Sequence, residues 1–336
     1  MLEPPADLSD ATLAAAISAA YGPISSLTFL PLGHDANAWV YAARRDVGRE
    51  LFVKVRLAIT NEAALVVPHH LAALGIDGVI APLATIGGGL WTSAARYAVI
   101  AYPFLRGATA MDTGMSEEQW RSYGRLLRAI HGAPVGKDLA RLLRHDSFSP
   151  DGARSVRNLD EFLQAARQVD QPRASVAQFW RDNRGLIEHI LSTAEQLGSE
   201  LARTAPSLVL CHADIHTNNV LVAEDGRIWF VDWDETMLAP RERDLMFVIG
   251  GIHHSFVDDR QTRLFLDGYG PVDVDPDALA FYRYSWAISD IASYGEQVFL
   301  RRELGSKNLA EAVSRFHSLF EPGSIVDIAL GSRSRG

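Results

Sequence analysis

One stretch of polar residues between two apolar runs constrains this chain more than any other feature. It reads LVLCHADIHTNNVLV over residues 208–222, and its apolar ends are typical of short buried strands. The polar residues between them are His212, Asp214, His216, Asn218 and Asn219. Short polar residues often form no more than a turn, but here histidine and aspartate alternate directly after an apolar strand. We therefore expect a functional loop at this point of the fold.

A hairpin is predicted immediately after this loop. The run NNVLVAEDGRIWFVDWD has two short apolar segments around an Asp-Gly pair at 225–226, which is typical of a tight turn. The second segment leads to Asp232, so the hairpin would return this carboxylate towards Asp214 and Asn219. Three oxygen-bearing side chains should therefore meet at one end of a hairpin.

Two kinds of chemistry fit this group. On a continuing strand, His212, Asp214 and His216 would share one face and could bind zinc in a metal-dependent hydrolase. Phosphoryl transfer instead needs a carboxylate beside the acceptor hydroxyl, an asparagine and a second aspartate for Mg²⁺, and a distant lysine for the nucleotide phosphates. The order Asp214, Asn219, Asp232 matches that need, and we favour phosphoryl transfer.

The overall composition indicates the class of protein and its partners. The chain has 336 residues, 48% hydrophobic and 22% charged, which is typical of a globular protein with a sizeable core. Its net charge of −9 argues against nucleic acid as a partner, because phosphate backbones attract basic surfaces. We expect no signal peptide and no membrane span, since the N-terminus has no basic segment before an apolar run and no apolar stretch reaches about 18 residues. These features predict a cytoplasmic protein.

The chain changes from β-rich to helical along its length. A helix over 8–22 precedes strands expected at 26–30, 38–43, 50–57, 79–86 and 97–105. A helix at 61–74 should be kinked or ended by Pro68. Further helices are expected at 116–132, 155–170, 175–203, 241–249, 259–268, 276–301 and 307–320. The first of these opens with Ser116 and Gln119 in capping-box spacing.

The motif His212-x-Asp214-x-x-x-x-Asn219, followed by Asp232 in VDWD, resembles that of the aminoglycoside phosphotransferase family. The resemblance covers nearly the whole chain. It implies an α+β, two-lobed protein-kinase-like fold, with a β-rich nucleotide-binding lobe over 1–104. A helical lobe over 105–336 would hold the catalytic loop, the metal site and the substrate pocket. Within the family, IAYPFL, CHADIHTNNVLV, VDWDETMLAPRERDLMF and GYG are most similar to spectinomycin phosphotransferases.

The resemblance assigns nucleotide-binding residues in the first lobe. Lys54 in LFVKVRL matches the strand lysine that contacts the phosphates, and Glu62 matches the helix glutamate that pairs with it. The segment GHDANAWVYAA occupies the place of a phosphate-covering loop, with Gly33 and Asn37 as its candidate contacts, although it lacks a triple-glycine motif.

The segment AYPFL is the expected hinge. There, adenine would hydrogen-bond to backbone groups of Pro103, Phe104 and Leu105. A simple strand between domains would have the same residues, so only the resemblance favours this role. Pro103 has no N–H and could only accept a hydrogen bond.

In the catalytic loop, the resemblance makes Asp214 the base and gives Mg²⁺ to Asn219 and Asp232. His212 would be structural and would brace the loop. The chain's one cysteine, Cys211, neighbours it, but consecutive strand residues point to opposite faces, so we expect a small buried hydrophobe and not a nucleophile.

Acidic and aromatic residues after Asp232 are candidates for holding a cationic substrate. The candidates are Asp234, Glu235, Trp233, Trp286 and Glu296. A tryptophan at helical spacing is also typical of a core, and that alternative stays open.

The resemblance implies an antibiotic-resistance type of kinase that uses ATP and Mg²⁺ to phosphorylate a hydroxyl of an aminocyclitol or aminoglycoside antibiotic, with spectinomycin the nearest expectation. Its partners would be the nucleotide and a hydroxylated, cationic small molecule, without nucleic acid or membrane. A kinase for another antibiotic such as a hygromycin, for choline, for a sugar or for homoserine stays open. The complete set Lys54, Asp214, Asn219 and Asp232 argues against a nucleotide-binding pseudokinase.

Overall fold

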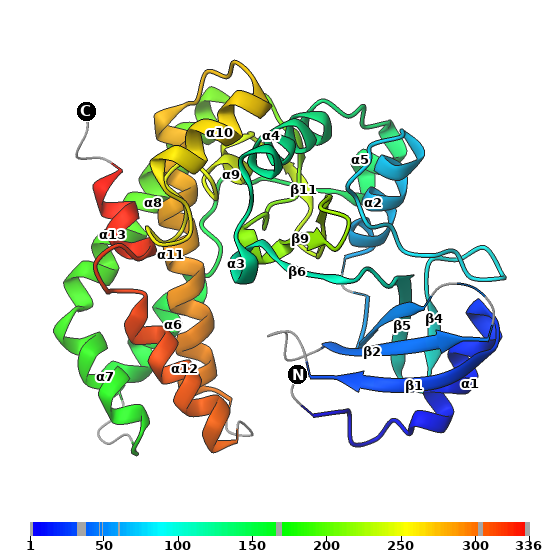
Figure 1. Cartoon of the computed structure of the whole chain (residues 1–336). Coiled ribbons are helices and arrows are strands. Elements are labelled where there is room, and N and C mark those ends of the chain that lie inside the picture. Colours follow the sequence, from blue (N-terminus) through cyan, green and yellow to red (C-terminus); the bar gives the residue numbers. More distant parts are fainter. Residues whose placement is uncertain are drawn as a thin grey trace. The chain divides into compact units, whose positions relative to one another are not determined.

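The computed structural model describes residues 3–31, 38–46, 48, 50–59, 61–165, 170–301 and 305–332. They form a mixed α+β chain with a β-rich N-terminal part and a mainly helical C-terminal part (Figure 1). The chain divides into two compact units, one of residues 1–144 and 212–237 and the other of 145–211 and 238–336. The predicted α+β class is confirmed. The predicted lobe boundary after residue 104 differs from this division and stays a prediction.

A five-stranded antiparallel sheet begins the first unit. Its strands run in the order β1 (Ile24–Leu30), β2 (Ala38–Arg45), β3 (Leu51–Arg56), β5 (Tyr97–Pro103) and β4 (Thr92–Ala94). Helix α1 (Asp10–Tyr21) packs against β1 and β4 (Figure 1). It begins at Ser9, whose hydroxyl accepts a hydrogen bond from the backbone N–H of Thr12 at 3.2 Å.

The core of this sheet fixes the direction of the β3 side chains. Leu13 and Ile17 of α1 are fully buried in one cluster with Val53 and Val55 of β3. Because side chains alternate along a strand, Lys54 points to the opposite face.

The first unit also contains the predicted loop and hairpin. Its remaining elements are α2 (Ala63–Ala73), β6 (Gly107–Thr109), α3 (Ala110–Thr113), α4 (Glu117–His131), α5 (Lys137–Leu142), the 3₁₀ turn η1 (Thr217–Asn219), β9 (Val220–Ala223) and β10 (Ile228–Phe230). Strands β10, β9 and β6 form a second sheet in that order. Phe230 lies opposite Val220, and Gly226 takes the left-handed turn with φ +82°, so the predicted hairpin is confirmed. The capping box of α4 is present as predicted.

The second unit is mainly helical. Its helices are α6 (Ala153–Ala165), α7 (Arg173–Asp182), α8 (Arg184–Thr204), α9 (Glu242–Leu245), α10 (Asp259–Tyr269), α11 (Pro276–Phe299), α12 (Ser306–Ser318) and α13 (Ile325–Gly331). The long helix α11 packs against α6, α8, α12 and α13 (Figure 1), and it starts at the N-cap Asp275 with Pro276 in its first turn. A third, short sheet has the order β7 (Arg144–His145), β11 (Met237–Ala239) and β8 (Val209–Cys211).

Two local expectations differ from the structure, and a third is narrowed. Residues 79–86 form no strand. Val79 makes a single bridge to Phe230, and Pro82 removes a donor that a ladder would need. The single helix expected at 175–203 is two helices, because the Asn183 side chain donates to the carbonyl of Phe179 at 2.9 Å where α7 ends. Pro68 was expected to kink or to end its helix; α2 continues past Pro68, so the proline does not end it, and the kink stays a prediction.

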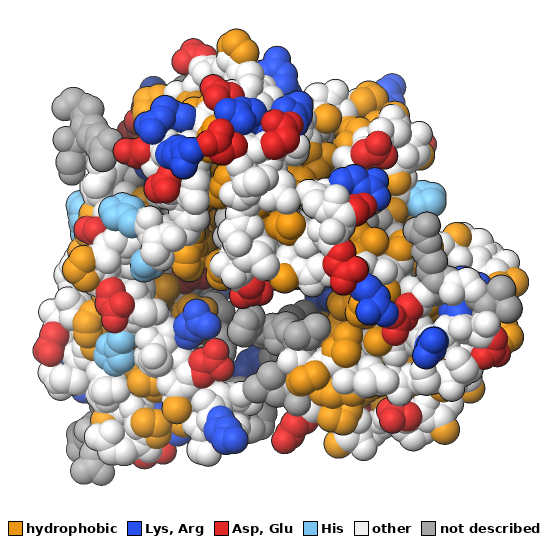
Figure 2. All heavy atoms as spheres, in the orientation of Figure 1, with side chains coloured by type: hydrophobic (Ala, Val, Ile, Leu, Met, Phe, Trp, Pro, Cys, Tyr) orange, Lys and Arg blue, Asp and Glu red, His pale blue; other side chains and the backbone are white. Residues whose placement is uncertain are grey.

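The surface of the described chain is charged and mixed. On the face shown in Figure 2, acidic and basic side chains are interspersed. None of the helices among the described residues has both the length and the apolar character that crossing a membrane requires.

Candidate active site

The polar loop leaves β8 at its last residue, Cys211, and adopts a strained backbone. Ala213 has φ +68° and Asp232, at the end of the hairpin, has φ +62°. Both lie in the left-handed region, where a non-glycine residue persists only when surrounding contacts hold it. Tyr123 of α4 supplies one such contact, because its hydroxyl donates to the carbonyl of Ile215 in the middle of the loop.

Asp214 is held by the loop itself. The Asn219 side-chain nitrogen donates to the backbone carbonyl of Asp214 at 2.7 Å and to its carboxylate Oδ2 at 2.9 Å. The other oxygen, Oδ1, lies 3.4 Å from Nε2 of His216. The carboxylate is 23% exposed, so it is oriented by its neighbours and still reachable from solvent. The structure thus brings together Asp214 and Asn219, as the sequence predicts.

His212 ties the loop to the strand that carries Asp232. Its ring is fully buried, and Nε2 lies 2.9 Å from the carbonyl of Val231, so this nitrogen must carry the proton. The N–H of Val231 donates in turn to the carbonyl of Asn219 at 3.0 Å. Val231 is therefore held from both sides by the loop. This geometry agrees with a bracing role for His212, which stays a prediction.

The zinc alternative finds no support in this geometry. Strand β8 ends before His212, so His212, Asp214 and His216 do not share one face of a continuing strand. His212 also uses Nε2 for the carbonyl of Val231.

Lys54 joins the first sheet to the end of the hairpin. Its Nζ lies 3.0 Å from Asp232 Oδ1 and 2.9 Å from Asp234 Oδ2. Burial lowers the pKa of Lys54, but the two carboxylates outweigh it and raise the pKa overall. Burial likewise acts to raise the pKa of Asp232, while the charge and hydrogen bond of Lys54 hold it below the usual value. Both groups are therefore charged at neutral pH.

Two further residues, not predicted from the sequence, belong to this network. Arg56 lies two residues after Lys54 on the same strand face, and its Nη1 is 2.6 Å from Asp234 Oδ2. Asn61 donates from its amide to the carbonyl of Asp234 at 2.8 Å and accepts from the N–H of Ala63 at the start of α2. The spacing of two along β3 was a signal for Arg56, and the position just before a helix was a signal for Asn61.

The predicted pairing of Lys54 with Glu62 does not occur. Among the residues that the structure describes, Lys54 has ion pairs with Asp232 and Asp234 and none with Glu62, which lies at the N-terminus of α2. A nucleotide-related role for Glu62 stays a prediction.

The other predicted nucleotide contacts are only partly described. Gly33 and Asn37 lie outside the described residues. Pro103 ends β5, and the N–H of Phe104 donates to the carbonyl of Glu50 at 3.1 Å. The N–H of Phe104 is therefore already used within the protein. An adenine bound here would depend on the other backbone groups of residues 103–105.

Three of the predicted substrate contacts lie in the first unit, and they differ in how exposed they are. Trp233 is buried, with its ring 4.5 Å from that of His212, so it is part of the core. Asp234 is paired with the two cations of β3. Glu235 is 54% exposed and lies 3.4 Å from Arg144. Of the three, Glu235 is the most accessible.

Two predicted contacts and the cysteine lie in the second unit. Trp286 and Glu296 are half-buried residues of α11, and Trp286 packs edge-on against Phe247 at 4.9 Å and under Arg243 at 5.3 Å. Cys211 is fully buried, its thiol faces the carbonyl of Ala239, and burial raises its pKa well above the usual value. The thiol is therefore protonated and not a nucleophile, as the sequence indicates.

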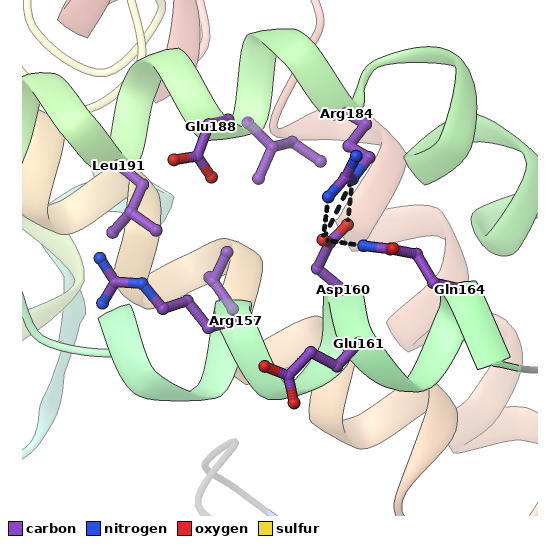
Figure 3. A pocket seen from close by; sticks show the side chains of 9 residues that line it. Arg157, Asp160, Glu161, Gln164, Arg184, Glu188 and Leu191 are labelled. Atoms are coloured by element: carbon purple, nitrogen blue, oxygen red, sulfur yellow. Dashed lines mark hydrogen bonds and ion pairs between the residues drawn. The ribbon is translucent and has the colours of Figure 1, made fainter.

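A groove in the second unit contains none of the predicted site residues among its lining residues. It has a volume of about 340 Å³, lies between α6 and α8, and is lined by charged residues (Figure 3). Its central carboxylate, Asp160, accepts hydrogen bonds from Arg184 at 2.9 Å and Gln164 at 2.6 Å. The bond from Arg184 holds the pKa of Asp160 below its usual value although burial opposes it. These partners give Asp160 a structural role.

Comparison with known proteins identifies the family to which this chain belongs. The sequence model described as the phosphotransferase enzyme family matches residues 28–282, well over half of the chain. The crystal structure of spectinomycin phosphotransferase APH(9)-Ia in complex with ADP and spectinomycin is similar, with a TM-score of 0.87 and 30% identity. That match covers 97% of this chain and 99% of the other.

Two curated relatives are also similar to this chain. Protein StrN from Streptomyces griseus is 25% identical over 292 residues, which are 81% of this chain and 79% of that protein. An aminoglycoside 3'-phosphotransferase from Niallia circulans is 27% identical over 147 residues, so the match spans 53% of that relative and 39% of this chain. The chain therefore belongs to the phosphotransferase enzyme family and is an enzyme of the aminoglycoside phosphotransferase type, with the protein-kinase-like fold that these enzymes share.

Proposed function

We propose that this enzyme transfers the γ-phosphoryl group of ATP, with Mg²⁺, to a hydroxyl group of an aminocyclitol antibiotic, and that spectinomycin is its acceptor. The observation that carries the proposal is the arrangement of Asp214, Asn219 and Asp232 around one loop and one hairpin, with Lys54 beside Asp232. Phosphoryl transfer depends on positioning and charge more than on covalent chemistry, and this group supplies both.

Asp214 acts as the base. Its carboxylate accepts the hydrogen bond of the acceptor hydroxyl and takes the proton as the oxygen attacks the γ-phosphorus. The new bond joins the acceptor oxygen to phosphorus, the bond to the β–γ bridging oxygen breaks, and ADP leaves with the electron pair. Such a base contributes about 10²–10⁴-fold to the rate. Because Asn219 already holds Oδ2 of Asp214, the carboxylate is oriented before the acceptor arrives.

Asn219 and Asp232 would hold Mg²⁺, which prefers oxygen ligands and keeps several waters. The donor set fits this ion. The Asn219 nitrogen is committed to Asp214, so its amide oxygen is turned away from that carboxylate, and Asp232 is ionised and 46% exposed. When bound, the ion neutralises charge that develops on the phosphates. Lys54 supplies a second positive charge for the nucleotide phosphates.

The choice of spectinomycin as the acceptor rests on similarity to a solved structure. The solved structure with 30% identity is a spectinomycin phosphotransferase in complex with ADP and spectinomycin. The net charge of −9 fits a cationic acceptor, and we keep Glu235 as an acceptor contact because its side chain is 54% exposed. An intracellular place of action and a role in resistance are part of the same proposal.

The test is ADP release by the purified enzyme over a panel of acceptors. The panel contains spectinomycin, hygromycin, two typical aminoglycosides, choline and homoserine, each with ATP and Mg²⁺, and each repeated with EDTA. We expect turnover with spectinomycin that EDTA abolishes, and thermal stabilisation by ATP that needs Mg²⁺.

Other results would change different parts of the proposal. Turnover with another acceptor alone would keep the mechanism and replace spectinomycin. Stabilisation by ATP without turnover of any acceptor would favour a pseudokinase. The absence of ATP binding would contradict the kinase proposal itself.

A further inference from the structure

His216 lies in the loop and has no part in the mechanism described above. Its side chain is 20% exposed, and both of its ring nitrogens face groups of the loop. Nδ1 accepts a hydrogen bond from the N–H of Asn218 at 3.2 Å, which makes His216 the N-cap of η1. Nε2 lies 3.4 Å from Oδ1 of Asp214. One ring thus connects the turn that carries Asn219 with the carboxylate of Asp214.

These contacts fix which ring nitrogen carries the proton. A backbone N–H only donates, so Nδ1 must offer its lone pair to Asn218 and cannot be protonated. A neutral imidazole then has its proton on Nε2, the nitrogen that faces Asp214. Because Nδ1 is unprotonated, the ring carries no net charge, and it offers its Nε2–H to the carboxylate.

The carboxylate of Asp214 has two oxygens, and each has its own neighbour. Asn219 donates to Oδ2 at 2.9 Å, and His216 faces Oδ1 at 3.4 Å. The torsion about the bond from Cβ to the carboxylate is broad in aspartate, so the side chain has little preference of its own. Contacts on both oxygens restrict the turn more than a contact on one oxygen does. The 3.4 Å between Nε2 of His216 and Oδ1 of Asp214 is long for a hydrogen bond, and catalytic hydrogen bonds often shorten when substrate binds.

We propose that His216 is a positioning residue whose Nε2–H orients the carboxylate of Asp214 towards the acceptor hydroxyl. This inference rests on the proposed function, in which Asp214 is the base. Its consequence is kinetic. Without the second contact the base is misplaced at the moment of transfer, while ATP and acceptor still bind. A small misplacement of a catalytic group lowers a rate by about 10–100-fold. Because ATP and acceptor still bind, this loss should appear in kcat and not in KM.

Two substitutions separate this role from the capping of η1. In His216→Asn, the amide oxygen takes the place of Nδ1 and keeps the cap, but the side chain at position 216 no longer offers a donor to Oδ1 of Asp214. In His216→Gln, the amide nitrogen takes the place of Nε2 and restores the donor. We expect His216→Asn to keep the wild-type melting temperature and both KM values within about 3-fold, and to lose about 10–100-fold in kcat. His216→Gln should recover most of that loss.

Three results would overturn the inference. The first is wild-type kcat in His216→Asn, which would reduce the side chain to a cap. The second is equal kcat in the Asn and Gln variants. The third is a loss confined to the KM for ATP, which would make His216 a nucleotide contact. In an Asp214→Asn background, adding His216→Asn should change kcat by less than about 2-fold, because the group to be oriented is absent.

A spectroscopic measurement tests the same inference without turnover. Nitrogen NMR of the full-length protein labelled at histidine reports which ring nitrogen is protonated, and the His216→Gln variant identifies the signal. We expect the Nε2–H tautomer at pH 7 and a shift of the Nε2 signal in Asp214→Asn. An Nδ1–H tautomer, or a signal unaffected by Asp214→Asn, would contradict the inference. This outcome is independent of the acceptor, so a failure of the proposed function would be recognised separately.

Discussion

Replacing Lys54 with methionine should lower both the stability of the protein and its affinity for ATP. Removing one partner of a buried ion pair costs about 3–5 kcal/mol, whereas exposed pairs contribute about 0–1 kcal/mol. Lys54 is 16% exposed, and its partners Asp232 and Asp234 are 46% and 28% exposed. The contribution of this network to the free energy of unfolding therefore lies between those of a buried and an exposed ion pair. Arg56 keeps its contact with Asp234, so the variant leaves mainly Asp232 uncompensated. We expect the free energy of unfolding to fall by about 2 kcal/mol at pH 7.

The pH dependence of this loss gives a second, independent check. Lys54 holds the pKa of Asp232 below its usual value although burial opposes it. A lowered pKa in the folded state contributes stability above the ordinary aspartate pKa, and this stability is lost as the pH falls through the lower value. The difference between wild type and Lys54→Met should therefore shrink below about pH 4.

Urea unfolding followed by tryptophan fluorescence measures both quantities. The matched control is Lys137→Met, the same change at an exposed lysine at the start of α5, which should alter stability by less than about 0.5 kcal/mol. Binding of ATP with Mg²⁺ to Lys54→Met should weaken by about 10-fold or more, since the variant lacks the positive charge that we propose for the nucleotide phosphates. Equal stability of the two methionine variants at pH 7 would refute the reasoning about the network.

Two further predictions concern stability elsewhere in the chain. Burial raises the pKa of the half-buried Asp290 to about 7 against a hydrogen bond from Trp286, so the unfolding free energy should fall by about 2–3 kcal/mol as the pH rises from about 4 to 7. This part of the pH dependence should vanish in Asp290→Asn, and its persistence would exclude that carboxyl as the cause. A Cβ at Gly107 would lie 2.2 Å from the carbonyl oxygen of Val222, so Gly107→Ala should cost about 2–3 kcal/mol in urea unfolding. Gly185→Ala, in helix α8 with open space around it, should change stability by less than about 1 kcal/mol, and equal effects of the two would contradict the steric account.

The parts of the fold that follow from local sequence were predictable. The hairpin turns at an Asp-Gly pair, and helix α4 begins at Ser116 with its capping box, as the sequence indicates. Predictions failed where a single residue competes with a local pattern. Asn183 interrupts an otherwise helical run with its own side-chain hydrogen bond, and Pro82 denies an apolar segment its ladder.

In the candidate site, too, local contacts were predictable from the sequence and long-range contacts were not. Asp214 and Asn219 are five residues apart and contact each other within one loop, so their spacing was informative. The partners of Lys54 are 178 and 180 residues away in the chain, and no local pattern decides between them and Glu62. His216 was visible in the motif, but the positioning role that we propose depends on which ring nitrogen faces Asp214, and only the geometry shows this.

The central claim is that Asp214 is the base of a phosphoryl transfer. The most direct measurement is kcat for ADP release with spectinomycin in Asp214→Asn and, as a control, in Asp138→Asn, whose side chain is 97% exposed on α5. We predict that Asp214→Asn lowers kcat by about 10²–10⁴-fold, with ATP binding and melting temperature close to wild type, and that Asp138→Asn changes nothing. Turnover by Asp214→Asn at the wild-type rate would contradict the account.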